Sequence, residues 1–464
     1  NEEVIAPCRR LFSSEIHDFM EKNGSSDLLE EKNRKSAAEE VNYWCAQEAT
    51  YHCSDDRTLS ALAVYRRGNG RCGEESVFTV NAMRSIGIPA RQVYAPKWSH
   101  CDDNHAWVEI WHEGVWYFLG ACEPAPLNHG WFTNASSRAM MVHSRWFDTV
   151  SSGGEETGKE GMVTMLNELR RYARTAEICV KVLDRDERPV KGAHIYFQVL
   201  NYSEFASVAR GVTDENGECR LTTGSGSLAL QIVYKEWWEC VFADTRSCTQ
   251  YTVVVGKDKK EENVWTETDM FAPLDAPVNP STMTSGQKEE RDARLEKAAA
   301  YRISRKENWK NPECEKFLRG ESGEDAADGD ALDTLRGELL EVLTEKDRTD
   351  LRAEVLEEHL KYALPYEENM EHNLFVSCVL NPRVDDEVLM KYRGAVENAF
   401  TEEEKDLFRE DPRMIWETVD KKITSVPEKE RESVITTPAG CLKTGTGSAR
   451  SKKILAAAIA RTLG

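Results

Sequence analysis

The chain has 464 residues, of which 40% are hydrophobic, and a formal net charge of −21 at pH 7. A chain of this length and apolar content buries several hydrophobic cores, and we expect three domains. The acidic excess argues against a nucleic-acid partner or an anionic membrane surface. No apolar run approaches the length of a membrane span, so no membrane span is predicted.

The thirteen cysteines are odd in number and follow no regular spacing. This usage is typical of unpaired thiols in a reducing compartment rather than of a disulfide framework. We therefore favour a cytoplasmic location. Because the chain begins at Asn1 with no signal-peptide pattern, export after removal of a leader stays open as the alternative.

Cys72 stands at the start of a predicted helix. Glu74 and Glu75 suit a first helical turn, Gly87-Ile88-Pro89 ends the helix, and an apolar stripe lies between them at Val77, Val80, Met83 and Ile86. Backbone N–H groups at a helix N-terminus are unpaired, so they lower the pKa of a thiol and hold an oxyanion when a carbonyl is attacked. The position predicts a nucleophilic cysteine.

Two β-strands are predicted after this helix, over residues 105–111 and 115–119, with a turn at Glu113-Gly114. His105 begins the first strand and is the candidate base and acid for Cys72. The hairpin returns the chain toward His105, and Glu123 is the candidate carboxylate that orients the imidazole. The predicted catalytic residues are therefore Cys72, His105 and Glu123.

These segments resemble the transglutaminase-like superfamily, which includes transglutaminases, peptide N-glycanases and many bacterial presumed peptidases. The resemblance covers about residues 1–150 and implies a papain-like core with Cys72 as nucleophile and His105 as base and acid. The sequence departs from the family where Gly120 replaces the usual aspartate, which leaves Glu123 as the nearest carboxylate. The matching motifs are Gly70-Arg71-Cys72-Gly73-Glu74-Glu75, Ile86-Gly87-Ile88-Pro89-Ala90-Arg91, Asp103-Asn104-His105-Ala106-Trp107-Val108-Glu109 and Trp116-Tyr117.

An aromatic group surrounds the candidate site, and such rings are usually core residues. Some of them are candidates to line a substrate groove, and we select Trp98 and Trp107 from Tyr94, Trp98, Trp107, Trp111, Trp116 and Trp131. A metal site is the rival interpretation for His100, Cys101, His105, His112 and Cys122. Adjacent strand residues point to opposite faces and make poor joint ligands, so we expect no metal and no cofactor.

Residues 151–175 are predicted as a linker, beginning at Ser151-Ser152-Gly153-Gly154, and a short connecting helix. Alternating apolar residues over 176–256, with a hairpin signal at Asn216-Gly217, predict a small β-sandwich. Its turn segments resemble the carboxypeptidase-regulatory-like, prealbumin-type fold. That resemblance implies a structural spacer or a binding module without catalytic residues.

Residues 257–330 are predicted as a charged linker and helix, containing Pro273, Pro277 and Pro280. The acidic stretch Asp325 to Asp330 is interpreted as a solvated loop. Residues 331–464 carry helical periodicity and heavy charge. A mostly helical C-terminal region is therefore expected.

An internal repeat is predicted within this last region. Asp385-Asp386-Glu387-Val388-Leu389 matches Asn1-Glu2-Glu3-Val4-Ile5 at an offset of 384. At an offset of 377, Gly445, Gly447, Arg461 and Gly464 fall on Gly68, Gly70, Arg84 and Gly87. Ala449 takes the place of Cys72, so the second copy has no nucleophile. Since the chain stops at Gly464, we expect this copy to be incomplete and the natural protein to continue.

The predicted fold class is α+β multidomain: a papain-like transglutaminase core over 1–150, an all-β sandwich and a mostly helical C-terminal region. The predicted function is a cysteine-dependent hydrolase of bacterial type, a peptidase or amidase that works through a thioester on a peptide or protein substrate. A weak or inactive peptide- or glycan-binding scaffold and a transamidating transglutaminase are the alternatives. Peptide N-glycanase-like deglycosylation is a further option, although the CxxC zinc pairs of that group are absent. The sequence does not predict the oligomeric state.

Overall fold

The computed structural model describes residues 7–147, 154–160, 163–256, 267–275, 283–306, 309–321, 330–426 and 435–464. The chain forms two compact units, each assembled from separate stretches of sequence. Unit 1 combines Tyr51–Glu74 with Ala300–Gly464, and unit 2 combines Cys8–Thr50 with Glu75–Ala299. The short segment Tyr51–Glu74 therefore folds with the C-terminal helices, although it lies inside the predicted catalytic core.

An aromatic cluster in unit 2 joins two N-terminal helices with the part of α4 (Cys72–Ser85) that begins at Glu75. Phe12 comes from α1 (Arg9–Lys22), Trp44 from α2 (Arg34–Glu48), and Phe78 from α4. All three side chains are buried, and their ring centroids lie 5.4 to 5.7 Å apart. Because aromatic pairs at this spacing add to the burial of apolar area, the cluster fixes α4 against the two N-terminal helices.

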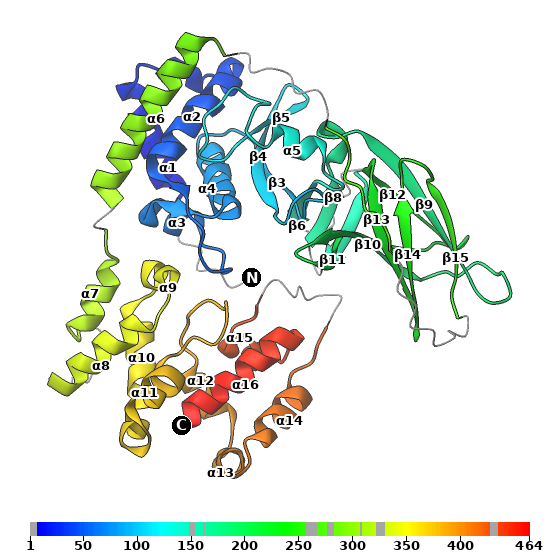
Figure 1. The fold of residues 1–464 in the computed structure, drawn as a ribbon. Coiled ribbons are helices and arrows are strands. Elements are labelled where there is room, and N and C mark those ends of the chain that lie inside the picture. The colour runs from blue at the N-terminus through cyan, green and yellow to red at the C-terminus, as the bar shows by residue number, and fades with distance from the viewer. Residues whose placement is uncertain are drawn as a thin grey trace. The chain divides into compact units, whose positions relative to one another are not determined.

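A six-stranded antiparallel sheet follows, and α2 and α4 lie beside its β3–β5 end (Figure 1). The predicted hairpin is confirmed: His112 pairs with Val115 across a two-residue turn. Glu113 and Gly114 both have positive φ, the backbone that such a turn requires. In sheet order the strands are β5 (Val115–Leu119), β4 (His105–His112), β3 (Ala90–Ala95), β6 (His143–Phe147), β8 (Val163–Asn167) and β7 (Glu156–Glu160).

The connecting helix expected within 151–175 is wrong. The described residues there form β7 and β8, which extend the sheet, and then a single 3-10 turn, Leu169–Arg171. Met165 and Leu166 lie on β8, which is buried on both faces. A strand buried on both faces has no alternation, so periodicity does not distinguish it from a helix. Residues 151–153 of the expected linker lie outside the described residues.

Two sheets form the predicted β-sandwich around one core, which confirms the all-β region (Figure 1, green). Inward-facing residues alternate along the strands, as in Ile195, Phe197 and Val199. One sheet orders β11 (Glu204–Val212), β10 (His194–Asn201), β13 (Ser227–Tyr234) and β14 (Trp237–Asp244). The other orders β12 (Glu218–Gly224), β9 (Thr175–Leu183) and β15 (Gln250–Val254).

The turn at Asn216-Gly217 does not close a hairpin, contrary to expectation. It connects β11 with β12, and these strands belong to different sheets. Asp214 accepts hydrogen bonds from the N–H groups of Asn216 and Glu218, which builds the turn locally. Gly217 has φ +72°, and a Cβ there would lie 2.5 Å from the carbonyl oxygen of Val182 on β9. The glycine thus serves a close backbone approach between turn and strand.

The C-terminal region of unit 1 is helical, as predicted, and it contains two hydrophobic clusters. Phe317, Leu339 and Leu356 belong to the first cluster, and Val396, Phe408 and Ile459 to the second. The principal helices of these clusters are α7 (Pro312–Leu318), α8 (Asp330–Glu341), α9 (Glu345–Asp350), α10 (Ala353–Ala363), α12 (Arg393–Ala399), α13 (Glu402–Glu410), α14 (Arg413–Lys422), α15 (Pro438–Thr444) and α16 (Ala449–Leu463).

The expected linker upstream of these helices is described only in part. Residues 267–275, including Pro273, contain no helix or strand, and α6 (Ser285–Lys306) follows. Residues 257–266 and 276–282, with Pro277 and Pro280, lie outside the described residues, as does most of the acidic stretch near 325–330.

Local structure repeats at the offset of 377 residues that the sequence indicated. The seven-residue helices α3 (Ala61–Arg67) and α15 begin after Ser60 and Thr437, whose hydroxyls each accept the N–H three residues on. Both end at a glycine of positive φ, Gly68 and Gly445. The next helix begins at Cys72 in one case and at Ala449 in the other. The second copy stays a prediction, and the segment Asn1–Ile5, which its first motif matches, lies outside the described residues.

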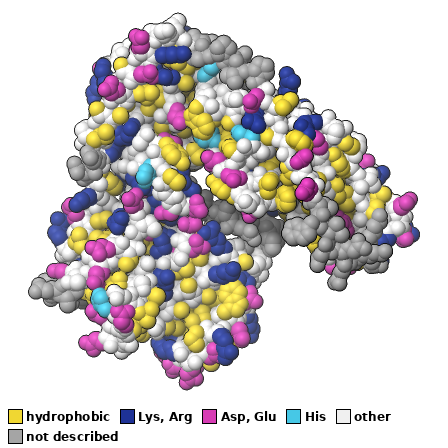
Figure 2. Space-filling model, viewed as in Figure 1, with side chains coloured by type: hydrophobic (Ala, Val, Ile, Leu, Met, Phe, Trp, Pro, Cys, Tyr) yellow, Lys and Arg dark blue, Asp and Glu magenta, His cyan; other side chains and the backbone are white. Residues whose placement is uncertain are grey.

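On the face shown in Figure 2, basic and acidic side chains are interspersed rather than gathered into one patch. In the part of the chain that the structure describes, no helix is both long enough and apolar enough to cross a membrane.

Candidate active site

Cys72 is the first residue of α4, as predicted, and its side chain is partly exposed. The buried carboxylate of Glu74 accepts hydrogen bonds from the backbone N–H groups of Arg71 and Leu59, at 2.7 and 2.9 Å. A Cβ on Gly70 would lie 2.9 Å from the Cβ of Glu74, so the chain passes this close only as glycine. These contacts fix the backbone on both sides of Cys72.

His105 is the first residue of β4 and is buried against aromatic rings. The rings of Trp131 and Phe132 lie 4.6 and 4.9 Å from the imidazole, measured between centroids. Burial lowers the pKa of His105 to about 4. Its Nε2 is buried and has no hydrogen-bond partner among the described residues. At pH 7 the ring is therefore neutral, which is the form that accepts a proton.

Glu123 lies in a turn after β5 that is closed by a bridge between Gly120 and Glu123. Its carboxylate accepts from the indole Nε1 of Trp131, at 2.9 and 3.1 Å from the two oxygens. Burial raises the pKa of Glu123, and the bond from Trp131 opposes that effect. No hydrogen bond joins Glu123 to His105 in the described residues; Trp131 contacts both. The orienting role of Glu123 stays a prediction.

The absence of a side chain at Gly120 leaves room for the carboxylate of Glu123. A Cβ at position 120 would lie 2.6 Å from Oε2 of Glu123 and 3.1 Å from its Cβ. Asn42 on α2 donates to the Gly120 carbonyl at 2.8 Å and holds this backbone in place. The Glu123 carboxylate thus occupies space that a side chain at position 120 would need.

Trp98 and Trp107 do not agree with the substrate-binding role predicted for them. They are 2% and 0% exposed and belong to one hydrophobic cluster, and the indole of Trp107 donates to the Tyr172 hydroxyl at 2.9 Å. Neither ring presents surface to a substrate. Trp131 is 64% exposed and adjoins His105 and Glu123. Residue type alone did not distinguish Trp131 from the buried tryptophans. The sequence signal for its exposure was the preceding Gly130, which indicates a turn.

The β-sandwich contacts the loop that leads into β4. Asn201, the buried last residue of β10, donates through Nδ2 to the carbonyls of Trp98, Cys101 and Asp103 at 2.9 to 3.2 Å. The Tyr202 N–H donates to the Asp102 carboxylate at 2.7 Å. The sandwich therefore fixes the backbone that precedes His105, a relationship that local sequence patterns do not reveal.

The candidate residues are distributed over the two units: Cys72 belongs to unit 1, and His105 and Glu123 belong to unit 2. Among the described residues, no three His, Cys, Asp or Glu side chains are grouped so as to hold a metal ion.

Residues 25–121 match the family model of the transglutaminase-like superfamily, which confirms the resemblance drawn from the sequence. Members of this superfamily are typically cysteine-dependent acyltransferases or peptidases. The matched segment contains Cys72 and His105 and ends two residues before Glu123.

Two solved structures are similar at low identity. Red sea bream transglutaminase is 9% identical over 57% of this chain and 58% of its own, with a TM-score of 0.22. A Streptococcal ancillary pilin is 10% identical over 36% of this chain and 61% of its own, with a TM-score of 0.17. The chain thus spans about three fifths of either protein, and at these scores neither likeness carries an argument. No curated protein matches the chain.

Proposed function

We propose that the protein is a cysteine-dependent hydrolase, a peptidase or amidase, with Cys72 as nucleophile and His105 as base and acid. The observation that carries the proposal is the position of Cys72 as the first residue of a 14-residue helix, inside the segment that matches the superfamily. A helix N-terminus favours the thiolate and offers N–H groups to an oxyanion.

The neutral imidazole of His105 suits the first step. It accepts the thiol proton as the Cys72 sulfur attacks the carbonyl carbon, and the carbonyl oxygen becomes an oxyanion near the first turn of α4. The imidazolium then gives its proton to the leaving amine, and the C–N bond breaks to leave a thioester. Water, deprotonated by His105, hydrolyses the thioester and releases the acid and the free thiol.

Glu123 is the third member of the proposed set. Its carboxylate fills the space beside Gly120, where the resemblance predicts aspartate, and Trp131 holds it by a hydrogen bond. The exposed ring of Trp131 is the surface that we assign to substrate contact.

A second candidate function is a peptide- or glycan-binding scaffold without catalysis. It is favoured by the bond of Glu123 to Trp131 rather than to His105, and by Ala449 at the position of Cys72 in the proposed second copy. The two functions differ in one property, because only the enzyme needs a reactive thiolate at Cys72.

The test is the pH dependence of iodoacetamide alkylation at Cys72, followed by peptide mass spectrometry in the native chain, His105→Ala and Glu123→Ala. The exposed Cys378 is the internal reference for an ordinary thiol. We expect Cys72 to react faster than Cys378 below pH 7 and to lose this advantage in His105→Ala. Equal alkylation rates at Cys72 and Cys378 in all three chains would contradict the hydrolase proposal and favour the binding scaffold.

A further inference from the structure

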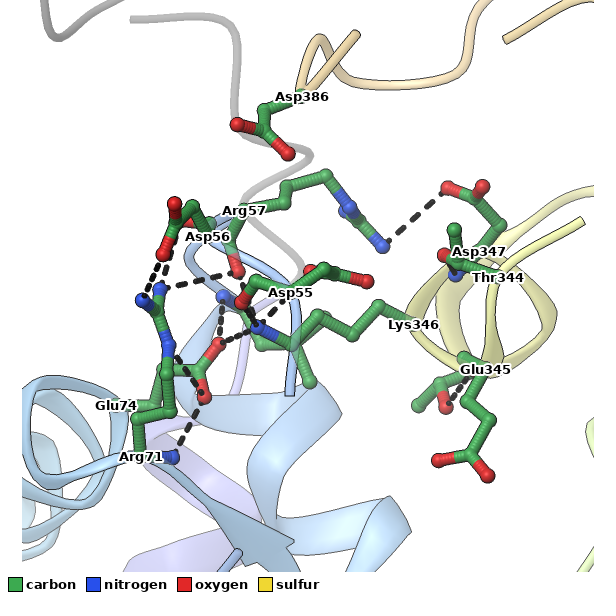
Figure 3. Close-up of polar contacts among 12 residues, drawn as sticks. Asp55, Asp56, Arg57, Arg71, Glu74, Thr344, Glu345, Lys346, Asp347 and Asp386 are labelled. Atoms are coloured by element: carbon green, nitrogen blue, oxygen red, sulfur yellow. Dashed lines mark hydrogen bonds and ion pairs between the residues drawn. The ribbon is translucent and has the colours of Figure 1, made fainter. Parts of the chain in front are cut away.

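A fully buried lysine lies in unit 1 beside the N-terminal turn of α4. The ammonium of Lys346, on α9, contacts the carboxylates of Glu74 and Asp55 at 2.9 and 3.1 Å. It also donates to the carbonyl oxygens of Asp55 and Arg57, at 2.7 and 2.5 Å (Figure 3). A buried ammonium without partners costs several kcal/mol, so these oxygens offset its desolvation.

Glu74 connects this lysine to the residue before the proposed nucleophile. One of its oxygens, Oε1, accepts from Leu59 N and pairs with Lys346 Nζ, while Oε2 accepts from Arg71 N. The Arg71 guanidinium in turn contacts the Asp56 carboxylate at 3.0 Å. The peptide unit between Gly70 and Arg71, one residue before Cys72, is thus held by a carboxylate whose charge is balanced by Lys346 at 2.9 Å and by the Arg71 guanidinium at 3.9 Å.

A second set of ion pairs holds the same loop to α9. The Arg57 guanidinium makes two hydrogen bonds to Asp350, at 2.8 and 3.0 Å, and lies 3.5 Å from Asp347. Asp347 also pairs with Arg383, and its N–H is capped by the Thr344 hydroxyl at 3.1 Å. Bidentate and charge-assisted bonds of this kind are directional. These bonds therefore fix the position of the loop around Arg57 relative to α9.

We propose that Lys346 is a positioning residue for Cys72, which makes the C-terminal helical region part of the proposed site. The inference rests on the proposed function. Lys346 balances a carboxylate two residues from the thiol, and an unbalanced negative charge there disfavours the thiolate. It also keeps Glu74 directed at the Arg71 N–H, which fixes where the helix begins.

The experiment compares Lys346→Met with Glu74→Gln, the double variant and a matched control, Lys391→Met. Lys391 is exposed and pairs with Glu354 at 2.9 Å. Two quantities are measured in the full chain: alkylation of Cys72 against pH, with Cys378 as reference, and amide hydrogen exchange of peptides covering residues 59–74. Far-ultraviolet circular dichroism verifies that each variant is folded.

We expect Lys346→Met to move the alkylation midpoint of Cys72 upward by about one pH unit. Amide exchange over residues 59–74 rises about tenfold because the acceptor of two N–H groups is released. The midpoint shift is smaller when Glu74→Gln is already present, since the unbalanced charge is gone. Lys391→Met changes neither quantity.

The possible failures are distinguishable. A folded Lys346→Met chain with native exchange and a native alkylation profile would overturn the role of Lys346, whatever the activity. If Cys72 already reacts like Cys378 in the native chain, the hydrolase proposal fails and so does the assignment of Lys346 to a catalytic site. A rise in exchange would then show only that Lys346 orders the loop.

Discussion

Glu123 and Gly120 share one small space: a Cβ on Gly120 would lie 2.6 Å from Oε2 of Glu123. The resemblance drawn from the sequence predicts aspartate at position 120, so the missing side chain there and the neighbouring carboxylate are complementary. We propose that the Glu123 carboxylate takes the role of that acid, and exchanging the residues at positions 120 and 123 tests this.

Glu123→Ala should reduce turnover of a peptide amide by about 100-fold if the carboxylate orients His105. Gly120→Asp alone should be unfavourable, because the new side chain meets Glu123 and brings two carboxylates together. The exchange variant Gly120→Asp with Glu123→Gly should recover much of the lost activity. Steady-state kinetics check this, and an exchange variant no better than Glu123→Ala would contradict it.

The imidazole of His105 should titrate near pH 4 instead of near 6.5, because burial deprives its charged form of hydration. Its base form then persists through the physiological range and is lost only as the pH falls through about 4. The folded pKa lies below that of the unfolded chain, so the contribution to stability is complete above pH 6.5 and declines below it.

NMR of the chain with 13C-labelled histidine measures this titration directly. His105→Gln identifies the signal among the ten histidines. A midpoint near 6.5 would show that water reaches the ring and would remove the argument for a neutral resting base.

Trp131→Phe keeps a ring beside His105 but removes the indole N–H that Glu123 accepts. Without this donor the partly buried carboxylate is less stable as an anion, so we expect the pKa of Glu123 to rise further and activity to fall about tenfold at neutral pH. Trp131→Ala should also raise KM, because an exposed aromatic surface is lost. The comparison of kcat and KM between the two variants separates the roles, and the exposed Trp238→Phe is the control.

Asn201→Ala should destabilise unit 2 by about 1 to 3 kcal/mol, because its amide donates to three buried or partly buried carbonyls in the loop before His105. Gln198→Ala, on the same strand and half-buried, removes a single long bond to Gln231 and should cost less than about 0.5 kcal/mol. Urea unfolding gives both values. Equal costs would show that the loop does not depend on Asn201.

The sequence predicted those features that depend on local pattern. The helix start at Cys72, the hairpin after His105 and the alternating strands of the sandwich follow from caps, turn residues and periodicity. The errors arose where tertiary packing decides: β8 is buried on both faces, and the turn at Asn216-Gly217 connects strands of different sheets.

For the candidate site, the residue types were predictable but their partners were not. Trp98 and Trp131 belong to the same aromatic group in the sequence, yet one is core and the other is exposed. The pairing of Glu74 with Lys346 joins residues far apart in the chain, so the periodicity of the local sequence does not predict it. Unit 1, which combines Tyr51–Glu74 with the C-terminal helices, was therefore not foreseen.

The ion pair between Lys346 and Glu74 also has a consequence for the order of assembly during synthesis. Chains are made from the N-terminus, so residues 55–74 leave the ribosome long before α9 exists. Until then Glu74 has no ammonium partner and Arg57 has no carboxylates from α9. A growing chain that has already completed the six-stranded sheet and the β-sandwich would still carry an unfinished helix start at Cys72. If the reactivity of the Cys72 thiol depends on the pairing of Glu74 with Lys346, the thiol becomes reactive only after the C-terminal helices have folded.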